Sequence, residues 1–250
     1  MSAAIIRTEN LFKSFHHQGI STPVISNLDI QIYPGEFIVI MGASGSGKSS
    51  LLYLLCGLDT ASSGSIWLDG FPVHALKEKA LALLRRKAVG FIFQDNNLVS
   101  GLTLKENILV AGYLSNRSRK LVNQEAHSLL ASLDIPELAG RFPTEVSGGQ
   151  LQRCAIARAL INNPLIVMAD EPTGSLNAES SEKALDCLTE QHKKGQTILM
   201  ATHSLRAACR ADKVYYLRDG QIAGTYQMIK ENENDKNEQD LFNWLKEKGW

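Results

Sequence analysis

Continuous apolar runs mark the buried strands of this 250-residue chain. The run Leu165–Ala169, bounded by Pro164 and Asp170, predicts a strand buried on both faces of a parallel sheet. Further apolar runs predict strands over residues 37–41, 89–93 and 197–201. The chain therefore carries candidate sheet strands at intervals along most of its length.

A two-residue alternation of apolar and polar positions marks a second group of strands. Such segments, typical of half-buried antiparallel strands, are residues 4–11 and 28–33. Residues 65–68, followed by Asp69-Gly70, predict another short strand and turn. Nearer the C-terminus, residues 213–218 and 221–223 flank Asp219-Gly220, which is a strong signal for a two-residue hairpin turn. The chain thus also predicts antiparallel β structure.

Helical patterns fill most of the remaining sequence. The predicted helices cover residues 50–56, 75–87, 104–114, 120–133 and 151–160. Thr103 followed by Glu106 is a capping-box pattern that opens the third of these helices. The segment between the strands at 89–93 and 165–169 is mostly helical, and the fold class is α/β.

The most informative stretch joins the apolar strand 37–41 to the pattern GxxxxGKS. Gly42, Gly45 and Gly47 allow positive φ angles, which turn backbone N–H groups inward around an anion. Lys48 supplies a mobile positive charge for the outer phosphates, and the Ser49 hydroxyl is suited to ligate a phosphate-bound Mg²⁺. The candidate nucleotide-binding residues here are Gly42, Ala43, Ser44, Gly45, Ser46, Gly47, Lys48, Ser49 and Ser50. The alternative is a structural glycine-rich turn, which the strand before and the helix after disfavour.

A second candidate anion site precedes the helix at 151–160. Ser147, Gly148, Gly149 and Gln150 stand directly before it, so that free backbone N–H groups and a hydroxyl face outward at a helix start. The apolar side chains of the helix itself recur at helical spacing and are core. One chain thus carries two candidate phosphate sites.

Polar side chains follow two of the buried strands. Asp170 and Glu171 emerge at the end of the strand 165–169, at the edge where open α/β sheets bind ligands. Asp170 is suited to hold Mg²⁺, and Glu171 is suited to accept a proton from an attacking water. Thr202 and His203 follow the strand 197–201 in the same way. The alternatives are a solvated acidic turn and a structural histidine, which the upstream Lys48 makes less favoured.

An aromatic side chain near the end of the first predicted strand is a candidate base-stacking group. Phe15, if exposed, could stack on a purine, and core packing is the alternative for it and, more strongly, for Phe12.

The overall composition narrows the classes of function. Lysine and arginine (26) balance aspartate and glutamate (26), so no global charge favours nucleic acid as a partner. No apolar run approaches the roughly 18 residues that span a bilayer, and the first residues lack the order of a secretory signal, so a cytosolic location is expected. The four cysteines lack metal-ligand spacing and are expected to be buried small hydrophobes: Cys56, Cys154, Cys187 and Cys209.

The C-terminal residues differ in composition from the rest. Residues 231–240 are polar enough to predict a solvated linker, and a short tail with Leu241, Phe242, Trp244, Leu245 and Trp250 follows. The tail is expected to pack on the domain or on a partner.

Taken together, these motifs resemble an ATP-binding-cassette (ABC) transporter ATPase subunit in order and spacing. The likeness rests on Gly42–Ser49, Gln94, Ser147–Gln150, Ile166–Glu171 and His203, and it extends to about residue 225. It implies a P-loop NTPase (RecA-like) core with a parallel central sheet, an antiparallel β subdomain and a helical ABC-specific subdomain. By this resemblance residues 1–225 form the nucleotide-binding domain, with the helical subdomain inserted at about 95–160, and residues 226–250 are the linker and tail.

The resemblance also implies roles for the site residues. Phe15 would stack on adenine, Gln94 would sense Mg²⁺ and the attacking water, Glu171 would be the catalytic base and His203 would contact the γ-phosphate. The implied metal ligands are Ser49, Gln94 and Asp170, the implied cofactors are ATP and Mg²⁺, and Lys48 and His203 would stabilise charge during phosphoryl transfer.

The same resemblance implies two protein partners. Two copies would pair head to tail, each placing Ser147–Gly149 on the ATP held by the other. A separate integral membrane permease would dock near Asp95–Asn107, which would hold the chain peripherally at the cytoplasmic face of the cell membrane.

A narrower likeness points to one branch of the family. Phe93–Leu98, Leu102–Ile108 and Asp170–Gly174 look like the macrolide-exporter and lipoprotein-release branch, and Ala201–Ala208 is most similar to the ATPases of bacitracin-type peptide resistance. Antimicrobial peptide or drug export is therefore the favoured function. The alternatives are a lipoprotein-release or cell-division type of ATPase, and a soluble ABC ATPase without transport.

Two positions depart from the family pattern. Asn177 stands where the family usually has Asp, which removes a charge and puts the coupling across the dimer in doubt. Ser204 follows His203 where Asp is more usual, and is expected to serve as a helix N-cap.

Overall fold

The structure is a computed structural model that describes residues 3–17, 19–229 and 234–250. The chain forms two compact units. The first contains the residues up to Leu81 together with Thr197–Trp250, and the second is Ala82–Gln196. The predicted division of the chain at residue 225 stays a prediction.

Parallel strands form the centre of the first unit. The strand β4 (Phe37–Met41) pairs in parallel with β9 (Thr197–Thr202) on one side and with β10 (Lys213–Arg218) on the other. Every residue of β4 and β9 is buried, as their apolar sequences predict. The strand β11 (Gln221–Gln227) closes the predicted Asp219-Gly220 hairpin with β10. The helix α1 (Lys48–Leu55) follows β4.

An antiparallel sheet makes up the rest of the β structure in this unit. Its strand order is β2-β1-β5-β6, and β3 pairs with β1. The strands are β1 (Ile6–His17), β2 (Ile20–Leu28), β3 (Gln31–Ile32), β5 (Ser63–Leu68) and β6 (Phe71–Pro72). The antiparallel β region is thus confirmed, and it is larger than the sequence pattern predicted.

The predicted single strand over residues 28–33 is wrong. Leu28 ends β2, and only Gln31–Ile32 form a separate strand. The Thr8 hydroxyl fills the break, because it donates to the carbonyl oxygen of Leu28 (2.9 Å) and accepts from the N–H of Ile30 (2.9 Å). The two-residue alternation continues across this break, so the pattern alone could not show it.

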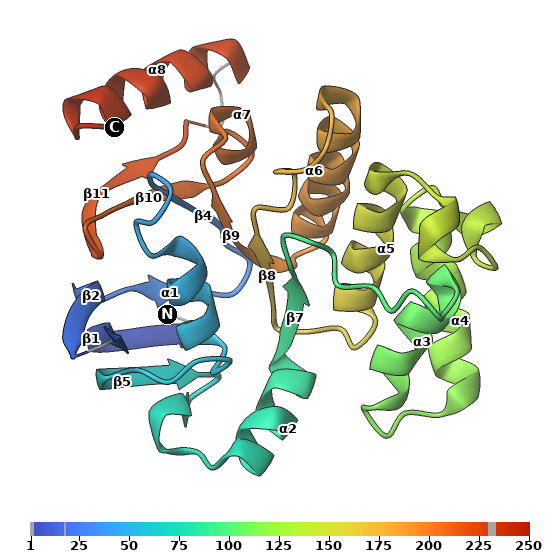
Figure 1. Cartoon of the computed structure of the whole chain (residues 1–250). Coiled ribbons are helices and arrows are strands. Elements are labelled where there is room, and N and C mark those ends of the chain that lie inside the picture. The colour runs from blue at the N-terminus through green and yellow to red at the C-terminus, as the bar shows by residue number, and fades with distance from the viewer. Residues whose placement is uncertain (1–2, 18, 230–233) are drawn as a thin grey trace. The chain divides into compact units, whose positions relative to one another are not determined.

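The second unit is mostly helical, as predicted. Its strands β7 (Val89–Ile92) and β8 (Ile166–Asp170) pair in parallel. Its longer helices are α3 (Leu104–Tyr113), α4 (Arg119–Ser132), α5 (Gly148–Leu160) and α6 (Ala178–Lys193), with 3₁₀ turns η2 (Pro136–Leu138) and η3 (Pro143–Glu145). The helix α3 packs against both α4 and α5 (Figure 1). The predicted capping box of α3 is present, with Thr103 and Glu106 bonded to each other's backbone N–H groups.

The structure differs from the predicted helices at two places. The helix expected from residue 75 begins only at Glu78 as α2 (Glu78–Ala88), because Val73–Ala75 form a 3₁₀ turn (η1) and Leu76 is extended. The helix α6 was not predicted at all. Its N-cap is Asn177, whose side-chain oxygen accepts from the N–H of Ser180 at 2.9 Å.

The C-terminal end of the chain also differs from the prediction. Residues 231–233 of the predicted linker lie outside the described residues, but residues 234–240 belong to the helix α8 (Asn234–Glu247). The helix packs through Leu241 and Leu245, which are fully buried, and through the buried Asn237, whose side-chain amide donates to the carbonyl oxygen of Ile229 at 3.0 Å. Trp244 lies against Tyr216 and Tyr226, which confirms that the tail packs on the domain. The short helix α7 (Leu205–Ala208) is capped by Ser204, as predicted.

The four cysteines are free thiols. Cys56 and Cys154 are buried as predicted, whereas Cys187 and Cys209 are only half-buried. Burial raises the pKa of the Cys154 thiol to about 12 and that of Cys209 to about 11. No helix among the residues that the structure describes is long and apolar enough to cross a membrane.

Candidate functional site

The glycine loop between β4 and α1 has the geometry of an anion cradle. Gly45 (φ 80°) and Gly47 (φ 100°) take the positive φ angles that the sequence predicts. The same prediction is wrong for Gly42, which is not among the described residues with positive φ. Gly42 is required for space, because a Cβ there would lie 2.4 Å from the carbonyl oxygen of Leu217.

Lys48 lies inside the loop. Its Nζ donates to the carbonyl oxygens of Gly42 (2.9 Å) and Ala43 (3.1 Å), and the residue is only 8% exposed. The N-cap of α1 is Gly47, and within the described chain no side chain caps this helix. The positive end of the α1 dipole and the buried ammonium group of Lys48 therefore both favour an anion at the glycine loop.

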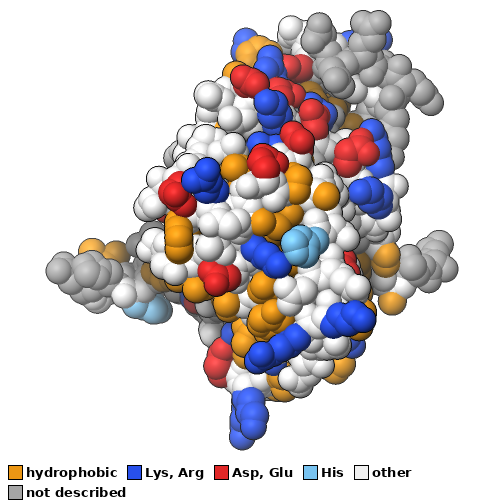
Figure 2. Space-filling model, turned by 90° about the vertical axis from the view of Figure 1, so that its right-hand side faces the viewer, with side chains coloured by type: hydrophobic (Ala, Val, Ile, Leu, Met, Phe, Trp, Pro, Cys, Tyr) orange, Lys and Arg blue, Asp and Glu red, His pale blue; other side chains and the backbone are white. Residues whose placement is uncertain are grey.

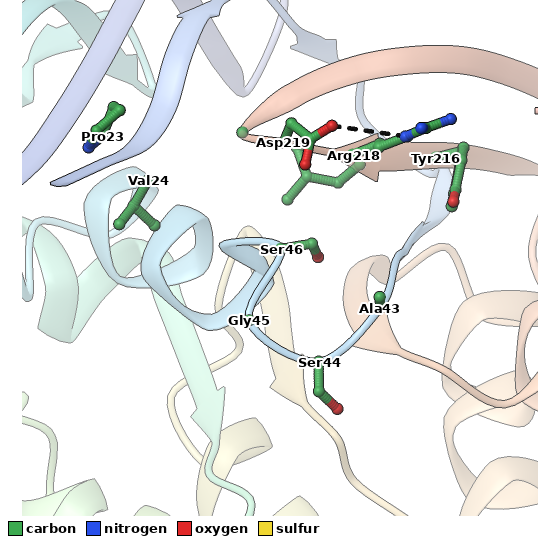
Figure 3. Close-up of a pocket in the computed structure, with 11 residues that line it drawn as sticks. Pro23, Val24, Ala43, Ser44, Gly45, Ser46, Tyr216, Arg218 and Asp219 are labelled. Carbon is green, nitrogen blue, oxygen red and sulfur yellow. Dashed lines mark ion pairs between the residues drawn. The ribbon is translucent and has the colours of Figure 1, made fainter. Parts of the chain in front are cut away.

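A cavity of about 370 Å³ borders the loop (Figure 3). Its walls are the loop residues 43–46, Pro23 and Val24 of β2, and residues 216–220 of the β10–β11 hairpin. Arg218 and Asp219 form an ion pair of 3.5 Å in this wall. The Ser46 hydroxyl is buried and has no hydrogen-bond partner among the described residues.

Two further predicted residues of the first unit are exposed. Phe15 is 47% exposed, so core packing does not account for it. Lys13, which sequence reasoning missed, places its Nζ 4.7 Å from the centroid of the Phe15 ring and pairs with Asp59 at 2.6 Å. His203 is exposed and directly follows β9.

The second candidate anion site is the start of α5. The helix begins at Gly148, earlier than predicted, with Ser147 as its N-cap. The Ser147 hydroxyl accepts from the N–H of Gln150 (3.4 Å), and the Gln150 side chain accepts from the N–H of Ser147 (2.8 Å). Ser147 and Gly148 are exposed, whereas Gly149 is buried with no room for a Cβ, which would lie 2.7 Å from Ser180 of α6.

The acidic pair lies at the end of β8. Asp170 is the last residue of the strand and is buried. Glu171 has a φ of 45°, and all the other described non-glycine residues with positive φ are asparagine or aspartate. A glutamate in this conformation is strained by about 1–3 kcal/mol, and such residues concentrate at functional sites. Its carbonyl oxygen accepts from the N–H of Gly174 at 3.0 Å, which holds the turn.

The turn after β7 is held by an arginine that sequence reasoning missed. Gln94 is exposed, two residues beyond β7. Arg158 of α5 donates to the carbonyl oxygens of Asn96 and Asn97, both at 2.5 Å. Burial lowers the pKa of Arg158 from its usual value. Only the folded chain brings α5 and this turn together, so no local signal marked the arginine.

A second cavity of about 380 Å³ lies in the second unit. Arg85, Arg86 and Arg158 line it together with apolar side chains that include Phe91 and Leu114. The face of the molecule on which α3 and α4 lie shows hydrophobic side chains among lysines and arginines (Figure 2). The exposed apolar residues here are Val110 and Tyr113 of α3, Leu114 directly after it, and Leu121 of α4.

The predicted docking segment 95–107 is only partly a surface. Asn107 is buried, and its side chain bonds to the backbone of Val99, Leu102 and Thr103. Leu104 is also buried, so the exposed residues of the segment are Asp95, Asn97, the loop residues 99–101 and Glu106.

The predicted site residues divide between the two units. The first unit holds Phe15, residues 42–50 and His203, and the second holds Gln94, residues 147–150, Asp170 and Glu171. The strand β4 is buried and parallel, and it leads through the glycine loop to the start of α1, where Lys48 is enclosed. This arrangement defines the class of the protein, which is a P-loop nucleotide-binding protein.

Comparison with known proteins then gives the family. The family described as "ABC transporter" matches residues 25–174. The chain is 42% identical over 220 residues to the "Bacitracin export ATP-binding protein BceA" of Halalkalibacterium halodurans, which covers 88% of this chain and 87% of that protein. The chain belongs to the ABC transporter family and is an ABC ATPase.

Other similar proteins are longer or are solved structures. The chain is 41% identical over 220 residues to the "Macrolide export ATP-binding/permease protein MacB" of Brucella abortus, covering 88% of this chain but 34% of that protein. It thus spans about a third of the length of the MacB relatives. The "Dimeric structure of a post-hydrolysis state of the ATP-binding cassette MJ0796 bound to ADP and Pi" is 32% identical with a TM-score of 0.83, covering 89% of this chain and 98% of that one.

Proposed function

We propose that this ABC ATPase binds ATP with Mg²⁺ at residues 42–50 and hydrolyses it to drive a separate membrane permease in peptide or drug export. The observation that carries the proposal is the phosphate loop, where the Lys48 ammonium group lies against the carbonyl oxygens of Gly42 and Ala43 at a helix start that no described side chain caps. A phosphate entering this loop meets a positive charge and a helix dipole that are already in position.

The proposed chemistry assigns a role to each of three polar side chains and one aromatic ring. Lys48 and His203 stabilise negative charge on the transferred phosphoryl group, and Glu171 accepts the proton of the attacking water. Phe15 stacks on the base, which its exposure and the nearby Lys13 favour.

Magnesium fits the oxygen donors that the sequence offers. Ser49, Gln94 and Asp170 carry hydroxyl, amide and carboxylate oxygens, which are the ligands that Mg²⁺ accepts alongside nucleotide phosphates. Bound Mg²⁺ would neutralise charge on the phosphates.

A second copy of the chain completes the proposed site. Ser147–Gly149 of one copy would lie on the γ-phosphate held by the other, so that ATP joins the two. The exposure of Ser147 and Gly148 at a helix start supports this assignment.

The permease is proposed because of the relatives' names and the arginine-lined cavity. MacB is named as an ATP-binding and permease protein, and BceA as an export ATP-binding protein. An apolar permease helix with an acidic end would suit the cavity that Arg85, Arg86 and Arg158 line. Of these, Arg158 also holds the turn after Gln94. Such docking would place the chain at the cytoplasmic face of the membrane.

The substitution Glu171→Gln tests the proposed hydrolysis. It keeps size and hydrogen bonding but removes the base, so ATP hydrolysis should fall by about 100-fold or more while ATP binding persists. The variant should also form an ATP-dependent dimer, measured by light scattering after gel filtration with MgATP.

The matched control is Glu179→Gln. Glu179 is an exposed carboxylate in the first turn of α6 that pairs with Lys183 at 2.7 Å. Its loss should leave hydrolysis unchanged. Unimpaired hydrolysis in Glu171→Gln would remove Glu171 from its proposed role.

A further inference from the structure

The C-terminal helix α8 is tightly packed on the β10–β11 hairpin. Leu241 and Leu245 are fully buried, and the Trp244 ring lies 6.5 Å from the ring of Tyr216 and 5.3 Å from that of Tyr226. Gly224 of β11 leaves space for the indole, because a Cβ there would lie 2.8 Å from Trp244. Figure 1 shows α8 lying beside β10 and β11. The helix is therefore an integral part of the first unit.

The end of α8 also holds the tip of the hairpin. Arg218 donates to the carbonyl oxygen of Lys248 at 3.0 Å. A guanidinium group at a helix C-terminus satisfies a carbonyl that the helix leaves unbonded and is favoured by the helix dipole. A Cβ at Gly249 would lie 2.5 Å from Nη1 of Arg218, so the backbone approaches this side chain closely. Arg218 thus joins the hairpin tip to the end of the chain.

The same hairpin forms one wall of the cavity beside the phosphate loop. Residues 216–220 face the loop residues 43–46 across this cavity (Figure 3). The hairpin also meets the backbone of the loop directly, since a Cβ at Gly42 would lie 2.4 Å from the carbonyl oxygen of Leu217. On the other side, the Gly220 carbonyl oxygen accepts from the N–H of Ser26 at 2.9 Å. The hairpin therefore cannot shift without displacing the loop or β2.

We infer that α8 positions the phosphate loop: Trp244 and Arg218 hold the β10–β11 hairpin, and the hairpin holds the backbone at Gly42 in the geometry that binds nucleotide. Trp244 is a positioning residue that touches neither the loop nor its ligand. The inference rests on the proposed function of the loop as an ATP site. By this inference, the packing of α8 raises the affinity of the phosphate loop for nucleotide.

The test is the affinity of the full-length chain for a fluorescent ATP analogue with Mg²⁺. In Trp244→Ala the dissociation constant should rise by about 5- to 50-fold, which is within the usual range for coupling between distinct sites. The matched control is Phe242→Ala, which also removes an aromatic ring from α8. The Phe242 ring contacts Trp250 and Lys246. The control should bind within about twofold of the original chain.

A second variant guards against a general loss of folding. Gly224→Ala pushes a methyl group against the Trp244 ring from the hairpin side and should weaken binding in the same direction. Hydrogen exchange of the peptide covering residues 42–49, measured without nucleotide, should become faster in both variants but not in Phe242→Ala. A purely structural role for Trp244 would lower the melting temperature without changing this exchange or the KM for ATP.

The outcomes separate this inference from the proposed function. If Trp244→Ala and Gly224→Ala bind the analogue as tightly as the original chain, the inference is wrong and the proposed function stands. If the original chain itself does not bind the analogue, the proposed function is wrong and the inference falls with it.

Discussion

The chain contains two helix starts suited to an anion, and they are built in opposite ways. At α1 the N-cap is Gly47 in a left-handed conformation, and no side chain of the described residues caps the helix. At α5 the N-cap is Ser147 in an extended conformation, and its hydroxyl and the Gln150 side chain complete a capping box. The first start is shaped by backbone packing and the second by side chains.

The difference shows what holds each helix start in place. Ser147 and Gln150 satisfy each other's N–H groups, so α5 is stable before any phosphate arrives. The α1 start relies on close packing instead, with Gly47 against the carbonyl oxygen of Val24. The α5 start is thus held by its own side chains and stays exposed for the proposed contact with a second copy's nucleotide, whereas the phosphate loop is held by packing against β2.

The largest expected effect comes from breaking the packed start. In Gly47→Ala the new Cβ would lie 2.7 Å from the Val24 carbonyl oxygen at a φ of 100°. Strain and clash together should weaken binding of a fluorescent ATP analogue by roughly 100-fold, measured by titration. Gly35→Ala is the control, because Gly35 has a similar φ of 79° but no atom within 4 Å of the new Cβ. Equal binding by both variants would contradict the packing argument.

A smaller effect is expected from Ser147→Ala. Loss of the cap should cost about 0.5–2 kcal/mol in the free energy of unfolding. ATP binding by a single chain should be unchanged, while steady-state hydrolysis should fall by about 10-fold because one hydrogen bond to a charged phosphate is lost.

Thr103→Ala is the matched control for this loss. Thr103 caps α3 with a complete capping box in the same unit. It should show the same loss of stability in urea unfolding without the loss of hydrolysis. If both variants lose hydrolysis equally, Ser147 acts only through helix stability.

The smallest effect is expected from Gln150→Ala. It removes the 2.8 Å bond from the Ser147 N–H but leaves the Ser147 hydroxyl in place. The bond is near the surface, so the melting temperature should fall by about 1–2 °C and hydrolysis by no more than about twofold. A loss as large as that of Ser147→Ala would mean that Gln150 itself contacts the ligand.

The departure at Asn177 is partly explained by the structure. Its amide oxygen caps α6 at 2.9 Å from the Ser180 N–H, which is a bond that an aspartate would also make. The uncharged residue therefore keeps the cap but lacks the charge by which an aspartate would add to the dipole interaction that Glu179 already makes in the first turn.

Much of the fold and the site could be predicted because the signals are local. The buried strands β4, β8 and β9 follow from continuous apolar runs, and the α3 capping box follows from residues three apart. The missed helices, α6 and most of α8, have polar sequences whose few apolar positions reveal themselves only by what they pack against.

The sequence by itself determined the phosphate loop, because its glycines, lysine and serine lie next to one another in the chain. Their spacing alone brings the backbone N–H groups, the ammonium group and the hydroxyl to one anion. Only the tertiary structure decided why Gly42 must be glycine, which arginine holds the turn after Gln94, and that Trp244 packs on the hairpin beside the loop. Each of these depends on contact between segments far apart in the chain. Local residue types and spacing do not reveal such contacts, since the contacts form only when distant segments pack together.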